Sequence, residues 1–237
     1  MEVRSQTDHA GGPPVQPARV PSLPVRMLQV FYAPGALCAK LRERPVWIAA
    51  LLLGGLFVAA SFFFVPAEMW ERTFREQMIN SGRTLPEGFE VGGMTRVFGT
   101  VGGVFSWFVL AFFLAGVVTV VFHFLLGDEG RYVQYLSMIA HALLIPAIGA
   151  LLVLPLKLAQ GDPRLTLNLA LFVPSSGDGY FLRVLRMLDL FMIWAYVVMG
   201  VGISRVDPRR GWGGATAFLI VLAVCIAMVF ATFTPGV

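Results

Sequence analysis

Five side chains could do chemistry at positions where this sequence is otherwise apolar. Arg183, Arg186 and Asp189 precede one apolar run, Lys157 ends another, and His141 lies inside that second run. A carboxylate with nearby cationic groups could form an ion-pair network, recognise a substrate or lipid head group, or take part in a proton relay. The choice between these roles depends on the elements that hold the side chains and on the solvent around them.

The composition excludes water as the main solvent of this chain. Of 237 residues, 57% are hydrophobic and 14% are charged, and the mean hydropathy is +0.75. Eighteen basic and 14 acidic side chains are too few to cover the apolar surface of a soluble domain of this size. Nucleic-acid binding is also disfavoured, because the basic residues are scattered between apolar runs instead of forming one patch.

Long uncharged stretches predict five membrane-spanning helices, since about 20 apolar residues are needed to cross a bilayer. The last 27 residues carry no charged side chain, and three other uncharged stretches contain 23 to 31 residues. The fourth helix in chain order is less regular, because Arg186 and Asp189 interrupt its start. The predicted fold is therefore an all-α polytopic transmembrane bundle, with helices at about 46–66, 97–126, 133–156, 182–205 and 213–234.

The segments before the first helix predict how the chain enters the membrane. Residues 1–25 are rich in proline and predict a disordered arm, whereas residues 26–44 predict an interfacial amphipathic segment broken at Pro34. Residues 45–237 then form the five-helix domain. Ten Lys and Arg residues fall on the N-terminal side of these spans and eight on the other. Together with the basic cluster before the first helix, this predicts a cytoplasmic N-terminus and an external C-terminus.

Two connecting segments lie on the predicted external side. Residues 67–95 begin as a helix, because Trp70, Phe74 and Met78 form a narrow apolar stripe suited to an interface. Residues 164–178 contain an alternating stretch that could be a strand, but an isolated strand is marginal. A re-entrant or interfacial segment is the preferred prediction there.

Depth in the bilayer limits what the polar side chains can do. If the fourth helix enters near Arg186, Asp189 lies about 5 Å deep, on the side where Lys157 ends the third helix. An ion pair or capped network joining these helices is the preferred interpretation, and head-group or substrate recognition is the alternative. His141 lies about 20 Å from Asp189 along the bundle axis, which is too far for direct proton transfer. We expect His141 to be a buried hydrogen-bonding residue.

The sequence contains none of the common catalytic motifs. Serine-hydrolase, zinc-protease, P-loop and dinucleotide patterns are absent, and neither cysteine has a metal-ligating neighbour. Small residues instead recur at helix-packing spacing, as at Gly99 and Gly103 or Ala223, Ala227 and Ala231. We therefore expect no enzyme and no cofactor, and we expect the lipid bilayer, a second copy or another membrane protein as partners.

Two stretches of the sequence resemble the Yip domain (Ypt-interacting protein) family of five-helix membrane proteins. The first is the entry Phe31-Tyr32-Ala33-Pro34, followed by Leu41-Arg42-Glu43-Arg44-Pro45-Val46-Trp47. The second is Leu185-Arg186-Met187-Leu188-Asp189-Leu190-Phe191-Met192-Ile193-Trp194, followed by Gly200-Val201-Gly202-Ile203. The resemblance covers about residues 25–235 and implies a cytoplasmic N-terminus and an external or lumenal C-terminus.

The resemblance also implies a class of function. Eukaryotic members of the family act in membrane trafficking and bind Rab-type GTPases, but the short proline-rich arm of this chain argues against such a partner. Of 18 basic residues only two are lysine, which indicates a GC-rich bacterial source and hence the inner (cytoplasmic) membrane. The predicted function is a non-catalytic membrane-organising or partner-binding role. A small transporter, channel or lipid scramblase that uses Asp189 is the alternative.

Overall fold

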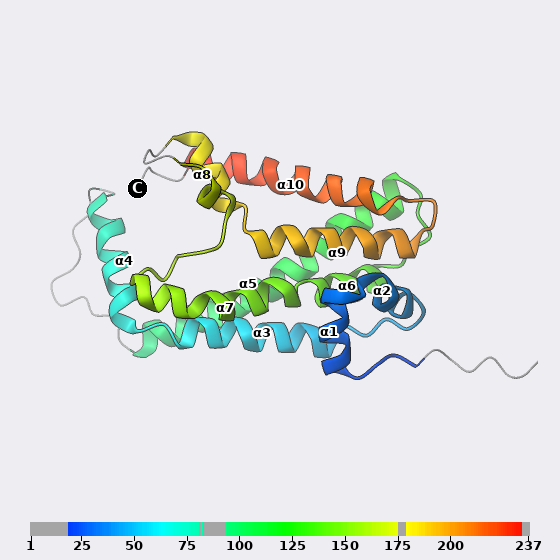
Figure 1. Ribbon diagram of the computed structural model, residues 1–237, viewed down its shortest axis with the longest axis horizontal. Helices are drawn as coiled ribbons and strands as arrows, with labels where there is room; N and C mark the ends of the chain where they lie inside the picture. The colour runs from blue at the N-terminus through cyan, green and yellow to red at the C-terminus, as the bar shows by residue number, and fades with distance from the viewer. Residues whose placement is uncertain (1–18, 81, 83–92, 175–178, 234–237) are drawn as a thin grey trace, which may run out of the picture.

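The computed structural model describes residues 19–80, 82, 93–174 and 179–233, and this part of the chain is helical, as predicted. Most of the predicted disordered arm, and residues 81 and 83–92 of the predicted 67–95 segment, lie outside the described residues. Outside its helices the described chain has one isolated β-bridge, between Asn168 and Asp189. The long apolar helices run lengthwise through the molecule, and shorter helices lie at its two ends (Figure 1). The long helices are α3 (Ile48–Phe63), α5 (Gly93–Val118), α7 (Leu144–Gln160), α9 (Leu190–Val206) and α10 (Trp212–Phe233).

Three helical stretches are long and apolar enough to cross a membrane by themselves. They are Arg96–Leu125, Tyr132–Gln160 and Trp212–Phe233. The first includes the π-helical segment η1 (Thr119–Leu125), and the second joins α6 (Tyr132–Ala142) to α7. Helix α3 has 16 residues and α9 has 17, so each is only about 24–26 Å long and falls slightly short of a full span. The five-span count stays a prediction.

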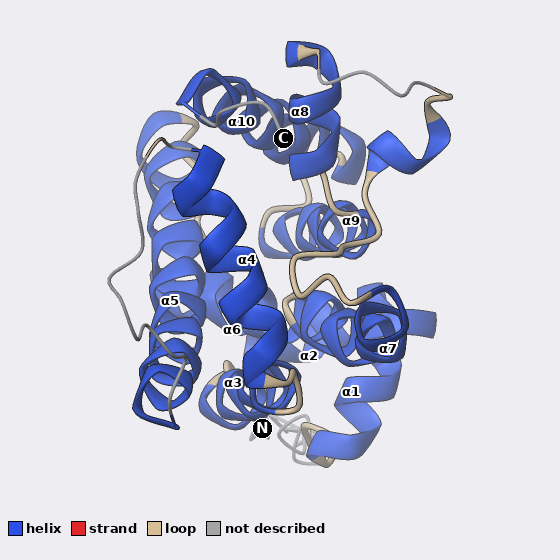
Figure 2. Ribbon diagram, turned by 90° about the vertical axis from the view of Figure 1, so that its left-hand side faces the viewer, coloured by secondary structure: helices blue, strands red, loops and turns tan. Residues whose placement is uncertain are grey.

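The two ends of the bundle carry different elements. The α1 end holds α1 (Leu23–Tyr32) and α2 (Pro34–Glu43), together with the loops at 126–131 and 207–211 (Figure 1). The α4 end holds α4 (Ala67–Asn80), the segment with the 3-10 helix η2 (Leu169–Phe172), and α8 (Tyr180–Met187). Helix α4 turns by 79° from α3 and lies across the end of the bundle, as the end-on view shows (Figure 2).

Proline and backbone hydrogen bonding explain the breaks in the predicted helices. Pro146 lacks the N–H that would bond the Ala142 carbonyl, and the third predicted helix is interrupted at Leu143 between α6 and α7. The fourth predicted helix, 182–205, is two helices, α8 and α9, separated by Leu188 and Asp189. At this second break Leu169 N–H donates to Leu188 O, and Leu190 N–H donates to Leu167 O. These bonds satisfy backbone groups that would otherwise be orphaned inside an apolar bundle.

Close helix contacts depend on glycine where an aromatic ring or a backbone lies opposite. A Cβ added at Gly54 would lie 2.5 Å from the Trp107 ring, and one at Gly103 would lie 2.8 Å from the Phe62 ring. Some of the small residues predicted to lie at helix contacts therefore do pack inside the bundle. Ala227 and Ala231 are also buried. Gly99, by contrast, has open space beside it. Small residues at these positions let α3, α5, α8 and α10 approach closely, as packing in lipid requires.

Candidate functional site

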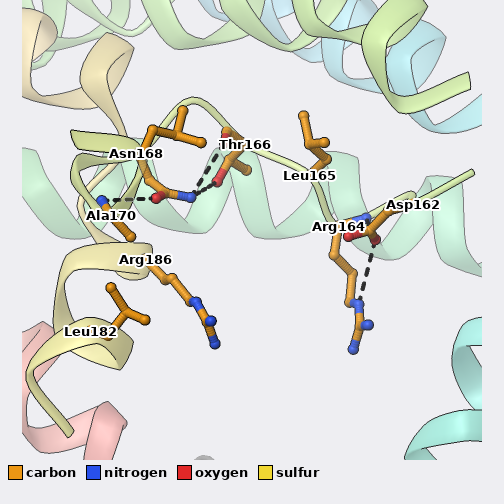
Figure 3. A pocket seen from close by; sticks show the side chains of 9 residues that line it. Asp162, Arg164, Leu165, Thr166, Asn168, Ala170, Leu182 and Arg186 are labelled. Carbon is orange, nitrogen blue, oxygen red and sulfur yellow. Dashed lines mark hydrogen bonds and ion pairs between the residues drawn. The ribbon is translucent and has the colours of Figure 1, made fainter. Parts of the chain in front are cut away.

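One predicted polar residue, Arg186, lines a cleft beside α8 at the α4 end of the bundle, which we call the α8 cleft (Figure 3). Its volume is about 600 Å³, and its lining residues are Asp162, Arg164, Leu165, Thr166, Asn168, Ala170, Leu171, Leu182 and Arg186. The helix α7 ends at Gly161, which adopts the left-handed conformation (φ 69°), and the chain then folds back along the cleft. The long side chains of Arg164 and Arg186 extend to the same side of it (Figure 3).

Hydrogen bonds fix the loop that forms one wall of the cleft. Asp162 Oδ1 accepts a hydrogen bond from Arg164 N–H and lies 3.7 Å from Arg164 Nε. Asn168 Nδ2 donates to Thr166 Oγ1 at 3.0 Å, while Asn168 Oδ1 accepts from Ala170 N–H. Asn168 therefore caps η2 and presents its backbone to the chain around Asp189. The sequence pattern did not single out Asn168, although Asn before a short helix is a common cap.

Asp189 is the N-cap of α9 and also lines a second hollow. Its Oδ1 accepts a hydrogen bond from Met192 N–H at 3.0 Å, which satisfies one of the free donors of the first helical turn. Asp189 is one of the residues that line a groove of about 310 Å³ between α5, α9 and α10, which we call the α9–α10 groove. The remaining lining residues are Leu110, Phe113, Leu114, Met187, Leu188, Met192, Ile193, Tyr196, Ala223, Ile226, Ala227 and Phe230.

The predicted cationic partners of Asp189 are near it but are differently placed. Lys157, on the last turn of α7, is close enough to interact electrostatically with Asp189. Within the described part of the chain, however, no ion pair of 4.0 Å or less joins these two residues. Arg183 and Arg186 lie on α8, and Arg186 lines the α8 cleft but not the α9–α10 groove. A capping role of Asp189 is thus visible, whereas a direct Asp189–Lys157 bridge is not.

His141 is buried far from this end and contacts a side chain that the sequence pattern did not select. Its Nδ1 lies 2.7 Å from Ser137 O, so Nδ1 carries the proton and donates. Its Nε2 therefore accepts, and Arg26 Nη1 donates to it at 2.9 Å. Arg26 belongs to α1 and is 8% exposed, while His141 is 1% exposed. The contact fastens α1 to α6. The sequence feature that could have indicated this contact is Arg26 itself, a charged residue between apolar residues of a short amphipathic helix.

We expect Arg26→Ala to loosen α1 without unfolding the bundle. The substitution removes the hydrogen bond to His141 and leaves a buried imidazole acceptor, a loss of about 1–3 kcal/mol from the docking of α1. Hydrogen exchange of the α1 amides should accelerate, while exchange in α9 and α10 stays unchanged. Arg19→Ala removes the same charge from an exposed position and serves as the control. Equal protection of α1 in both variants would show that the Arg26–His141 contact does not hold the helix.

Four charged residues form a second polar cluster at the α1 end, which we call the loop clamp. Arg210 Nε donates to Asp128 Oδ1 at 2.7 Å, and Arg209 bonds both Asp207 oxygens at 3.0 Å through Nε. The same arginines donate to the Leu126 and Gly127 carbonyls. The Asp128 side chain is fully buried. The clamp therefore ties the 126–131 loop to the 207–210 loop, and it was not anticipated from the separated charges in the sequence.

The charge state of the clamp predicts how its contribution depends on pH. Hydrogen bonds from Arg209 lower the pKa of Asp207 to about 2. A carboxyl group whose folded pKa is depressed contributes stability above its unfolded pKa of about 4, and this contribution disappears as the pH falls toward 2. The melting temperature of wild type should exceed that of Asp207→Asn by a constant amount between pH 7 and pH 5. The difference should shrink below pH 4. A gap that stays constant down to pH 2 would contradict this linkage.

The chemistry available at these sites is binding and structural fastening. Among the described residues, no group of three or more His, Cys, Asp or Glu side chains could hold a metal ion. Cys38 is a buried residue of α2, and burial raises the pKa of its thiol to about 12. The thiolate, which is the reactive form, is therefore disfavoured. The α8 cleft and the α9–α10 groove each include a charged residue predicted from the sequence, Arg186 in the first and Asp189 in the second.

An apolar helical bundle with exposed apolar side chains along α5 and α10 defines a multi-pass integral membrane protein. The Yip1 domain matches residues 28–233, so the chain belongs to the Yip1 domain family. The predicted family is confirmed. The chain is also similar to the membrane protein YknW of Bacillus subtilis (strain 168), with 23% identity over 201 residues that cover 82% of this chain and 85% of YknW. No solved structure gives a significant match.

Proposed function

We propose that this protein is a non-catalytic membrane-organising factor that binds another transmembrane segment through one face of α5. The observation that carries the proposal is a row of residues on the outward side of this helix, which we call the α5 stripe. Its members recur at intervals of three and four residues and are exposed or half-buried in the bundle: Gly99, Gly102, Ser106, Val109, Phe113 and Gly116. Added Cβ atoms at Gly99, Gly102 and Gly116 would meet nothing within 4 Å.

The spacing of the residues in the α5 stripe and their small size both favour a helix as the binding partner. A repeat of 3.5 residues follows one seam between two helices that cross at a shallow angle. Small residues in this seam allow the close approach on which helix association in lipid depends, because lipid offers no hydrophobic driving force for it. The opposite face of α5 packs on α3, where Trp107 Nε1 donates to Leu51 O. One face of α5 therefore builds the bundle. On the other, the stretch from Gly102 to Val109 is available to a partner or a second copy, while Gly99 borders a hollow beside α4 and Phe113 borders the α9–α10 groove.

Site-specific photo-crosslinking in native membranes tests this proposal. A crosslinker at Ser106 lies within the α5 stripe, and one at Val221, which is 60% exposed on α10, serves as the control. We expect a discrete protein adduct from Ser106 that is lost when Gly102→Leu fills the stripe, and only lipid adducts from Val221. The mass of the adduct separates a second copy from another protein. Lipid adducts alone at both positions would refute the partner-binding role.

The orientation is part of the same proposal. The positive-inside count and the family resemblance support placing the α1 end in the cytoplasm and the α4 end outside. In a cysteine-free background, Glu129→Cys at the α1 end and Asp162→Cys at the α4 end should label from opposite sides of the membrane. Labelling of Glu129→Cys from outside would reverse the orientation.

Transport or lipid movement is the second candidate function, and the α9–α10 groove favours it. A carboxylate that lines an otherwise apolar hollow in a membrane bundle is typical of substrate pathways. Its test is flux or lipid exchange in vesicles that contain the wild type or Asp189→Asn. Asparagine is an equivalent N-cap, so a loss of flux would report the charge and not the fold. Unchanged flux would leave Asp189 with its capping role alone.

A further inference from the structure

The α9–α10 groove is lined by one ionisable carboxylate and otherwise by side chains that suit hydrocarbon. Asp189 lies at its α4 end, and Tyr196 lies two helical turns further along α9, about 10 Å away. Ala223 and Ala227 line the α10 side, where their small size leaves the hollow open. The lining residues extend along α9 and α10, and Asp189 is the one charged residue among them, so we refer to this hollow as the slot.

The size of the slot decides what can occupy it. A helix with its side chains is about 10–12 Å wide, and a slot of about 310 Å³ cannot admit one. A single flexible hydrocarbon chain that lies along the bundle axis is compatible with both the volume and the apolar lining. In a membrane, phospholipid tails supply such chains.

The charge of the slot decides which phospholipid fits. A carboxylate that faces hydrocarbon is costly unless a cation or several donors compensate it. Met192 N–H donates to Asp189 Oδ1, the Phe191 backbone N–H also interacts with the carboxylate, and Lys157 is near enough to attract it. These partners leave part of the acceptor capacity of Asp189 unused. Lys157 does not line the slot. A primary ammonium group at the head of a lipid would supply three further donors and a positive charge inside the slot itself.

We infer that the α9–α10 groove binds a bilayer phospholipid with a primary ammonium head group, such as phosphatidylethanolamine. The ammonium group contacts Asp189, and one acyl chain lies in the slot toward Tyr196. Phe113 borders both the groove and the α5 stripe, but lipid binding at Asp189 does not depend on the partner-binding role of the stripe. A phosphatidylglycerol head group has no cation to offer Asp189, so the site discriminates between the two lipids.

Native mass spectrometry of the delipidated protein, titrated with phosphatidylethanolamine or phosphatidylglycerol, measures the preference. We expect the wild type to bind phosphatidylethanolamine about tenfold more tightly, which corresponds to about 1.4 kcal/mol. Asp189→Asn should abolish the preference and keep the melting temperature, because asparagine retains the cap. Ala223→Phe should weaken binding of both lipids, because it fills the slot and leaves Asp189 in place.

Asp162→Asn is the matched control, since it removes the same charge at the same end of the bundle but from the α8 cleft. It should leave the preference for phosphatidylethanolamine unchanged. The inference fails if the wild type shows no preference, if Asp189→Asn retains it, or if Asp162→Asn loses it as well. Crosslinking at Ser106 is unaffected by any of these results, so the two proposals fail independently.

Discussion

Replacing Gly200 by valine should separate α9 from α10 and destabilise the protein by about 3 kcal/mol. An added Cβ at Gly200 would lie 2.8 Å from Thr216 N and 2.9 Å from Trp212 O. Both atoms belong to the backbone of the neighbouring helix, so no side-chain rotation can relieve the overlap. Overpacking of a tight contact costs about 1–3 kcal/mol or more, which exceeds the gain of less than about 1 kcal/mol in helix propensity.

Thermal unfolding in detergent measures this effect, with Gly116→Val as the control. A Cβ at Gly116 would meet nothing within 4 Å, although the residue also lies within an apolar helix. We expect the melting temperature to fall by roughly 5–10 °C for Gly200→Val and to stay within about 2 °C of wild type for Gly116→Val. If both substitutions have the same effect, the close α9–α10 contact does not limit stability.

The second large effect should come from the loop clamp, where Asp128→Ala should cost about 2 kcal/mol. A hydrogen bond to a charged group contributes about 1.5–3 kcal/mol, and Asp128 accepts one from Arg210 in a fully buried position. The loss should stay below the 3–5 kcal/mol of a fully buried pair. Arg210 is 32% exposed and also donates to Leu126 O, so its guanidinium group can be hydrated once the partner is gone.

A double-mutant cycle with Arg210→Ala isolates the pair. The coupling energy between positions 128 and 210 should be about 1 kcal/mol or more, since the residues share a direct hydrogen bond. Glu129→Ala removes an adjacent exposed carboxylate and should change stability by less than about 0.5 kcal/mol. If the effects of Asp128→Ala and Arg210→Ala on the free energy of unfolding are additive, the Asp128–Arg210 contact makes no net contribution to stability.

Much of the fold could be predicted because membrane helices satisfy their backbone hydrogen bonds within one segment. The apolar stretches, the amphipathic entry broken at Pro34 and the helix after Pro66 all follow from local composition. The break between α8 and α9 was not predicted, although Asp189 is a strong N-cap residue. It depends on residues 167–169, which supply hydrogen-bond partners to the chain at the break. The alternating pattern there contributes a single β-bridge.

The candidate site was less predictable, because pairs of polar residues in it are distant in sequence. Arg26 and His141 are 115 positions apart, and Asp128 and Arg210 are 82 positions apart. The position of Asp189 next to an apolar stretch indicates that its negative charge needs a cation or hydrogen-bond donors. The sequence cannot show that Asp189 caps a helix and also lines a groove.

By itself, the sequence determined the solvent of this protein, its helical class and its membership of the Yip1 domain family. Those properties depend on the average composition of long stretches of the chain. In hydrocarbon, a backbone group without a hydrogen bond is costly, so each apolar stretch forms a helix that satisfies its own backbone. Only the tertiary structure decided which polar groups meet, which glycines are in contact and which face of α5 is left open. Each of these depends on how helices that are distant in sequence pack against one another. Close packing and hydrogen-bond geometry tolerate displacements of only about a few tenths of an ångström, and such distances cannot be obtained from the sequence pattern.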